Sequence, residues 1–483
     1  QQIATEFPYG EWYKKHVIDL DDLMSRQNLI GSDKTIPYDL KEQEMVFGYT
    51  QEDMDKIILP MARDGKQPID SMGMDVSLPV LSDRPQLLYD YFQENFAQVT
   101  NPPIDGVREN IVMSSLVMAG NVANIMDPDD ENTAALYLKR PILTNEEMAV
   151  IKSLMTDKLH TSVISMLYPV GGGPDAMETA IESLCIAALK AIRNGANILI
   201  LSDRGINSRM AAIPALLATA ALHHFLIRKT VRSDVGLILE SGEPREIHHF
   251  CTLVGYGITA VNPYVALESI KELAEKKKLG KISCEEAREN YIRAAVNGML
   301  AVMSKMGIST IHSYHGAQIF EAVGISRDLI QKYFVNTPSP IGGIGLTEIA
   351  RENALRHEAA FSGSDTLPKG DIYQYHKGGQ AHIIDPQAVQ LLQKACRTND
   401  YDLYREYADR VNTSSTYRLR DLLEFVYPAG CSIPIEEVES EDNIVKRFRT
   451  GPQQGSPRMC GPGHESSRRH EQYWRRRRRR SPF

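Results

Sequence analysis

The stretch Gly195-Ala-Asn-Ile-Leu-Ile-Leu-Ser-Asp-Arg204 decides the fold class, because it joins a short apolar run to a polar loop. We interpret Asn197–Asp203 as a β-strand, followed by a loop rich in Gly, Asn and Ser and then by a helix over Met210–Ile227. The same unit recurs from about residue 150 onward. Strands are predicted at Val235–Glu240, Ala260–Asn262 and Ile308–Ile311, with a helix around Glu246–Val254 after the first of these.

This alternation of strands and helices indicates parallel strands joined by helical crossovers. The predicted fold class is therefore α/β, as an open parallel sheet or a (β/α) barrel. Further along, prolines and glycines between about 330 and 375 predict a linker, and helices are predicted over Pro386–Thr398 and Asp400–Val411. Residues 1–40 lack a sustained period and are expected to be a connector lying on another part of the protein.

The amino-acid composition excludes several classes of protein. The 483 residues are 42% hydrophobic and 24% charged with a net charge of -8, which argues against wholesale disorder and against a nucleic-acid binder. The six cysteines stand far apart without iron–sulfur or zinc spacing. The longest apolar run, Met210–Ile227, is interrupted by Pro214, His223 and His224, so we predict a buried helix there and no membrane span.

Three polar residues end predicted strands, where a barrel would carry its chemistry. Converging side chains of Asp203, Glu240 and Asn262 could perform acid–base work. The alternative is that they cap the helices that follow, because Asp and Asn accept hydrogen bonds from free N–H groups at helix starts. We favour capping.

Two histidine pairs and two glycine clusters offer further alternatives. A metal site could be formed by the pairs His223-His224 and His248-His249 together with Glu240 or Glu243. Neighbouring histidines on a helix, however, point about 100° apart, so roles in the core or at a domain interface are favoured. Gly171–Pro174 and Gly342–Gly345 fit no complete phosphate-binding pattern, so turns are favoured over vestigial phosphate loops. No catalytic, cofactor-binding or metal-binding residue is assigned.

Several strings together resemble the central domain of glutamate synthases, in the same order and nearly the same wording. They are Pro141–Glu147, Gly195–Arg204, Glu240–His249, Gly255–Gly257 with Asn262–Tyr264, and Ser304–Thr310 leading into Gly316–Glu321. The strings Tyr373–Gly379, Leu419–Phe425 and Arg447–Gly451 resemble the opening of the family's (β/α)8 FMN-binding barrel domain. One departure is His315, at a position where family members usually carry Arg or Lys.

The resemblance implies a division into a connector from an amidotransferase domain (1–40), a central domain (41–330), and a linker with the truncated start of the FMN-binding domain (331–451). In the family, an amidotransferase domain that opens with cysteine releases ammonia into an internal tunnel. A barrel with FMN and a [3Fe-4S] cluster then reduces the imine formed from 2-oxoglutarate. The central domain joins the two and contributes tunnel wall.

The catalytic parts implied by the family are expected outside this chain, which opens with Gln1. The resemblance therefore implies an inactive fragment without its own cofactor, whose parent takes electrons from ferredoxin or from an NAD(P)H-oxidising subunit or domain, in the cytoplasm or a plastid. An alternative is a stand-alone scaffold that binds separately encoded amidotransferase and flavin domains. A third interpretation, an Arg-rich nucleic-acid binder, rests only on the tail.

That tail, residues 452–483, holds nine arginines against two acidic residues and ends in the run Arg475–Arg480. Every arginine codon has G in its second position, so a reading frame one nucleotide later yields only Gly, Glu, Asp, Ala or Val. In that frame Trp474 becomes Gly. The region from Glu471 then permits Ser-Asn-Thr-Gly-Glu-Gly-Gly-Glu-Asp, a flavin-domain signature of the family, and we expect an out-of-frame or mispredicted tail.

Sequencing the transcript across codons 448–483 tests this expectation. We expect a frame change, a missed splice site or an assembly error in that interval. An uninterrupted in-frame message that ends after Phe483 would contradict it.

Overall fold

The computed structural model divides into two units, Gln1–Asp421 and Leu422–Phe483. It describes residues 9–26, 39–69, 75–95, 104–121, 134–364, 366–413, 418–428, 430, 432–440 and 443–444. The tail at 452–483 lies outside the described residues. In the second unit the described residues include one short 3-10 helix, η7 (Ile435–Glu437).

A four-stranded parallel sheet forms the centre of the first unit. Its strands are β5 (Thr161–Ser165), β7 (Ile198–Ser202), β9 (Gly236–Glu240) and β10 (Ala260–Asn262), in the order β10-β9-β7-β5. Every residue of β7, β9 and β10 is buried, as expected for parallel strands covered on both faces. The register aligns Ser202, Glu240 and Asn262 across neighbouring strands, so their side chains start from one edge.

The α/β class with a parallel sheet is confirmed, and the strands predicted around β7, β9 and β10 are present. The described strands pair as an open sheet. The strand predicted at Ile308–Ile311 is wrong, because only Thr310 forms an isolated parallel bridge, to Ser114, before the short helix α13 (Ile311–Tyr314) begins.

The single helix predicted over Met210–Ile227 is also wrong. Met210–Ala212 is β8, which pairs antiparallel with β6 (Leu167–Pro169), and the helix α9 runs over Ala215–Arg228. Pro214 separates the two, because proline lacks an N–H and is tolerated only at a helix start. At 14 residues α9 is about 21 Å long. Each helix that the structure describes is too short or too polar to cross a lipid bilayer.

A second, three-stranded sheet packs against the first. Its order is β1 (Val17–Asp19), β4 (Ala134–Leu138), β3 (Val117–Asn121), with β1 parallel and β3 antiparallel to β4. Part of the predicted connector is thus a strand paired with the middle of the chain. The close approach of β3 to β9 depends on Gly236, since a Cβ there would lie 2.5 Å from the backbone nitrogen of Gly120.

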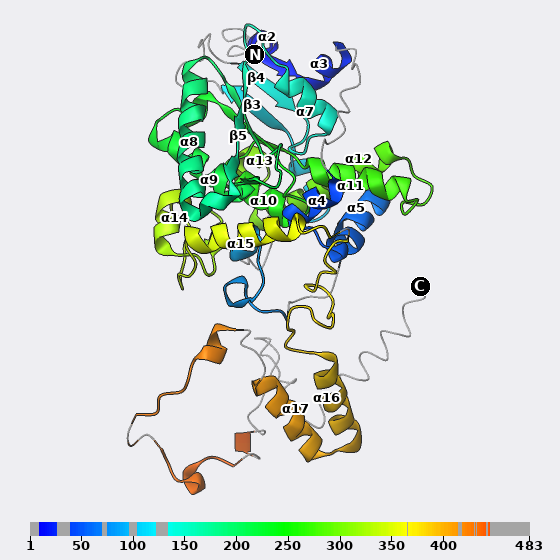
Figure 1. Cartoon of the computed structure of the whole chain (residues 1–483), viewed down its shortest axis with the longest axis vertical. Helices are drawn as coiled ribbons and strands as arrows, with labels where there is room; N and C mark the ends of the chain where they lie inside the picture. Colours follow the sequence, from blue (N-terminus) through cyan, green and yellow to red (C-terminus); the bar gives the residue numbers. More distant parts are fainter. Residues whose placement is uncertain are drawn as a thin grey trace. The chain divides into compact units, whose positions relative to one another are not determined.

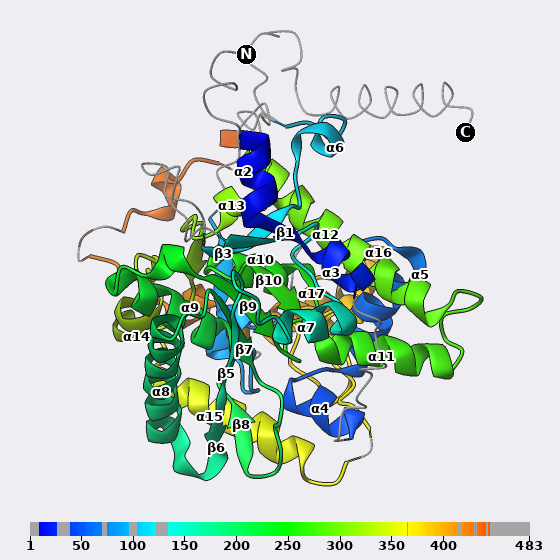
Figure 2. The same ribbon diagram turned by 90° about the horizontal axis from the view of Figure 1, so that it is seen from above.

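Helices cover the parallel sheet from two sides (Figures 1 and 2). On one side lie α8 (Gly173–Arg193) and α9; on the other lie α7 (Asn145–Lys152), α11 (Tyr264–Glu275) and α12 (Cys284–Met306). Capping residues set several of these bounds. Thr144 and Glu147 form a reciprocal capping box at the start of α7, and α12 begins after Ser283 and ends at left-handed Gly307.

The Pro- and Gly-rich region assigned to a linker contains a helix that the sequence analysis did not predict. This helix, α15 (Leu346–Ala360), packs against α8 and α4 (Leu40–Val46) and buries Ile349, Ala350 and Ala360. The predicted helices further along are confirmed as α16 (Pro386–Thr398) and α17 (Tyr401–Thr413), which pack together and are joined by an Arg410–Asp385 ion pair.

The remaining described elements are short. They are α2 (Tyr9–His16), α3 (Leu20–Arg26), the π-helix η1 (Asp53–Ile58), α5 (Leu59–Asp64), η2 (Pro79–Leu81), η3 (Leu88–Tyr91), β2 (Phe92–Glu94), α6 (Glu109–Val112), η4 (Val170–Gly172), η5 (Arg232–Asp234), α10 (Ile247–Gly255), β11 (Phe320–Ala322), α14 (Arg327–Tyr333) and η6 (Leu419–Leu422). Strands β2 and β11 pair antiparallel.

The contact between the two sheets yields a stability prediction. Gly236→Ala places a methyl group 2.5 Å from Gly120 N and 2.8 Å from Ala119 Cα, which are backbone atoms that cannot rotate away. We expect urea denaturation to show a loss of about 1–3 kcal/mol in the free energy of unfolding. Gly171→Ala is the control, because a Cβ there meets no atom within 4 Å. Equal stability of the two variants would contradict the packing described.

Candidate functional site

The carboxyl edge of the parallel sheet carries a buried carboxylate with several partners. Glu240, at the end of β9, accepts hydrogen bonds from Ser202 Oγ at 2.6 Å and from Arg204 Nε at 2.5 Å. Lys152 Nζ, from the end of α7, lies 2.5 Å from Glu240 Oε2 and 2.6 Å from Oε1. Three segments that are distant in sequence therefore meet on one side chain.

The electrostatics of Glu240 follow from these partners. Burial by itself would raise its pKa, but the positive charges of Arg204 and Lys152 and the hydrogen bonds from Lys152 and Ser202 hold the pKa below its ordinary value. Glu240 is therefore ionised at neutral pH, with both oxygens engaged. Such a carboxylate is a poor general base, because a proton would have to displace two ion pairs.

Asp203, the second of the three polar residues that end predicted strands, lies beside the same edge. Both of its carboxylate oxygens are 3.2 Å from the backbone nitrogen of Gly242, in the loop after β9. Burial raises the pKa of Asp203 to about 7, against the opposing effect of its hydrogen bonds. Asn262 instead donates to Leu143 O and to Asn145 Oδ1, each at 3.0 Å.

The prediction that these three residues cap the following helices is wrong. Helices α9, α10 and α11 begin after Pro214, Glu246 and Pro263. The strand-end side chains are held instead by neighbouring loops and by α7. Glu243, considered in the sequence only as a metal ligand, accepts from Ala215 N at 2.6 Å at the start of α9, where a carboxylate is favoured by the helix dipole.

The Glu240–His249 string continues into a second buried hub at Arg245. Its guanidinium donates to Phe47 O at 3.1 Å and to Gly48 O at 2.8 Å, and it lies 3.1 Å from Asp53 Oδ2. Burial would lower the pKa of Arg245, yet the charge of Asp53 keeps it above its ordinary value. The loop after β9 is thereby fixed to α4 and η1.

The two histidine pairs occupy separate environments. His249 stacks on Tyr89 with ring centroids 4.2 Å apart and lies 3.0 Å from Glu246, while His248 Nε2 is 3.1 Å from Tyr89 O. His223 accepts from Arg232 Nε at 3.0 Å, and burial lowers its pKa to about 2. Among the described residues, no three His, Cys, Asp or Glu side chains gather in a way that could hold a metal ion.

The two glycine clusters lie in different backbone settings. Gly171 and Gly172 belong to η4, which leads directly into α8. Gly342 and Gly343 have positive φ angles of 68° and 148°, and a Cβ at Gly343 would lie 2.0 Å from Gly324 O. This close backbone approach excludes a side chain at Gly343.

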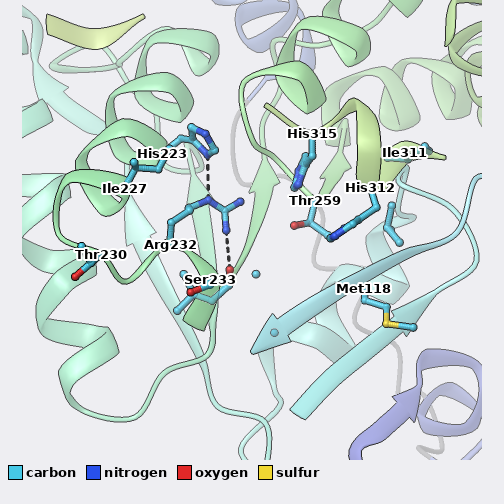
Figure 3. A pocket seen from close by; sticks show the side chains of 14 residues that line it. Met118, His223, Ile227, Thr230, Arg232, Ser233, Thr259, Ile311, His312 and His315 are labelled. Carbon is cyan, nitrogen blue, oxygen red and sulfur yellow. Dashed lines mark hydrogen bonds between the residues drawn. The ribbon is translucent and has the colours of Figure 1, made fainter. Parts of the chain in front are cut away.

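A cavity of about 590 Å³ lies near the opposite, amino-terminal ends of β9 and β10 (Figure 3). It is lined by Val117, Met118, Gly120, His223, Ile227, Thr230, Arg232, Ser233, Val235, Gly236, Thr259, Ile311, His312 and His315. The sequence analysis singled out His223 and His315 but not the cavity. Its walls come from β3, α9, η5, β9, the residue before β10, and α13, and no local motif links these segments.

The raised pKa of Asp203 predicts a pH-dependent contribution to stability. Because the folded-state pKa, about 7, exceeds the unfolded value of about 3.9, this contribution is fully present below pH ~4 and is lost as the pH rises through 7. We expect wild type to lose stability relative to Asp203→Asn by about 1.4 kcal/mol per pH unit between pH 5 and 6.5. Urea unfolding at several pH values measures this difference, and a difference that does not vary with pH would refute it.

Comparison with known proteins identifies the family. The glutamate synthase central domain family model matches residues 42–326. The glutamate synthase [NADPH] large chain of Bacillus subtilis is 43% identical over 455 residues, covering 93% of this chain and 29% of that protein. Ferredoxin-dependent glutamate synthase 2 of Synechocystis and glutamate synthase [NADH] of Schizosaccharomyces pombe are each 38% identical, covering 93% of this chain and 30% and 22% of those proteins.

The chain thus spans less than a third of the length of these relatives. Among solved structures, the recombinant flavin-binding domain of baker's yeast flavocytochrome b2 aligns with 60% of this chain and 94% of that chain, at 8% identity and a TM-score of 0.27, a likeness too weak to carry an argument. The family match rests on sequence and covers more than half of the chain. The protein belongs to the glutamate synthase family, with residues 42–326 matching the central domain of that family.

Proposed function

We propose that this chain is the connecting part of a glutamate synthase large chain, joining an amidotransferase domain to an FMN domain. The observation that carries the proposal is the match of 93% of the chain to less than a third of large chains that are themselves named glutamate synthases. The proposed parent reaction converts glutamine and 2-oxoglutarate to glutamate. The chain itself supplies tunnel wall and spacing and performs no chemical step.

The proposed domain bounds are those of the sequence analysis: connector 1–40, central domain 41–330, and linker with the start of the FMN-binding domain 331–451. Strand β1 supports close attachment of the connector, because it pairs with β4. Contacts of α15 with α4 and α8 support close attachment of the region after 330. A segment firmly packed at both of these places is suited to holding two flanking domains at a fixed distance.

The cofactors of the proposed parent are FMN and a [3Fe-4S] cluster, and the described residues do not fit either group. The described cysteines Cys185, Cys251, Cys284 and Cys396 include no cluster-forming set. At the carboxyl edge, where a barrel would hold a flavin phosphate, the cations Lys152 and Arg204 are already engaged by Glu240. We therefore assign both groups to other parts of the parent.

The proposed connecting role does not depend on the electron donor or on the compartment of the parent enzyme. Relatives named for NADPH, for ferredoxin and for NADH match this chain at 43%, 38% and 38% identity. This supports a role that does not depend on the donor, with ferredoxin or an NAD(P)H-oxidising partner acting elsewhere on the parent. A chloroplastic relative from Oryza sativa and bacterial relatives support a plastid or cytoplasmic location.

The proposal predicts that the purified chain binds no FMN and forms no glutamate from glutamine and 2-oxoglutarate with a reduced donor. The physical reason is that its carboxyl edge is engaged in internal ion pairs. The matched control is the same chain expressed contiguously with its flanking coding sequence, which is expected to be yellow and active. Flavin absorbance or glutamate formation by the chain on its own would overturn the proposal.

A further inference from the structure

The cavity near the amino-terminal ends of β9 and β10 has a chemistry that the connecting role does not use. One wall carries His223, Ile227 and Arg232, and the other carries His312 and His315 (Figure 3). Thr259, just before β10, lies between them. The side chains of Arg232 and His315 project toward the space between these walls.

Arg232 is a charged group without a counterion among the described residues. Its guanidinium donates to His223 Nδ1 at 3.0 Å, Val235 O at 2.8 Å and Gly257 O at 2.7 Å, which are all neutral acceptors. Described residues thereby engage three of its five N–H groups and leave two without a described partner. Burial lowers the pKa of Arg232 to about 10, still high enough for a positive charge at neutral pH.

The described residues that line the cavity include no Asp or Glu. The nearest acidic residue in sequence, Asp234, accepts a hydrogen bond from Ser233 at 3.2 Å. A desolvated cation is costly unless an anion compensates it. The cavity is therefore electrostatically suited to an anionic ligand.

The two partly buried imidazoles of His223 and His315 add one donor and one acceptor. His223 is neutral, and because its Nδ1 accepts from Arg232, its proton resides on Nε2, which is a donor. His315 Nε2 is a buried nitrogen with no hydrogen-bond partner. Burial lowers the pKa of His315 to about 3, and its hydrogen bond with the backbone of Ile258 opposes that shift, so Nε2 is left as the unprotonated acceptor.

We propose that this cavity is a binding site for a small phosphate-bearing anion, recognised by Arg232, His223 Nε2–H and His315 Nε2. A hydrogen phosphate accepts from the first two and donates its own O–H to the third. Sulfate, which has no proton to donate at neutral pH, satisfies only two of these contacts. The volume of about 590 Å³ leaves room for an organic group attached to the phosphate.

Isothermal titration of the full chain with inorganic phosphate at pH 7 and constant ionic strength tests the proposal. We expect one phosphate per chain, with sulfate at least tenfold weaker. Ser233 is exposed at the cavity, so Ser233→Glu adds a negative charge without disturbing the core. This variant is expected to weaken phosphate binding at least tenfold, while its uncharged match, Ser233→Gln, stays within threefold of wild type.

A second variant tests the acceptor. His315→Phe retains a ring of similar size but removes the nitrogen, so phosphate and sulfate should bind it with equal, weakened affinity. Unfolding midpoints measured for each variant establish that the fold is retained. Absence of phosphate binding by the wild-type chain, equal affinity of Ser233→Glu and Ser233→Gln, or an undiminished phosphate preference in His315→Phe would each overturn the proposal. None of these outcomes depends on glutamate synthase activity.

Discussion

The positions of the strand ends at the carboxyl edge of the sheet depend on the ion pairs of one buried carboxylate, that of Glu240. A charge removed from water must be compensated nearby, and here Lys152 and Arg204 do so from α7 and from the loop after β7. Because β9 lies between β7 and β10, fixing its end also fixes the neighbouring strand ends. In a barrel enzyme this edge would carry the reacting groups. In this protein it carries internal ion pairs.

Buried charged side chains in the loop after β9 also connect this loop to other elements of the chain. Arg245 ties the loop to α4 and η1, and Glu243 holds the start of α9. The string Glu240–His249, one of those that resemble the family, thus forms cross-links between elements far apart in sequence. For the connecting role proposed above, such cross-links matter more than a reactive side chain.

The sequence was sufficient for the strands and for helices with strong local signals. Buried runs such as Ile198–Leu201 have one plausible structure, and α16 has a clear start at Asp385 and an apolar period. The roles of polar strand ends could not be read in the same way. Lys152 and Glu240 are 88 residues apart in sequence. Their ion pair is therefore visible only in the folded chain, where the Glu240 carboxylate binds a lysine and an arginine and does not cap a helix. The cavity around Arg232 could not be predicted for the same reason, since its walls come from parts of the chain that lie far apart in sequence.

The account rests on a structural role for Glu240, and the free energy of unfolding of Glu240→Gln is its most direct test. Lys152 and Arg204 have side chains that are 31% and 33% exposed, so water can partly compensate their charges once the carboxylate is gone. We therefore expect a loss at the lower end of the range for broken buried ion pairs, about 3 kcal/mol. The exposed Glu275→Gln is the matched control and should change stability by less than about 0.5 kcal/mol. Equal stability of the two variants would contradict the account.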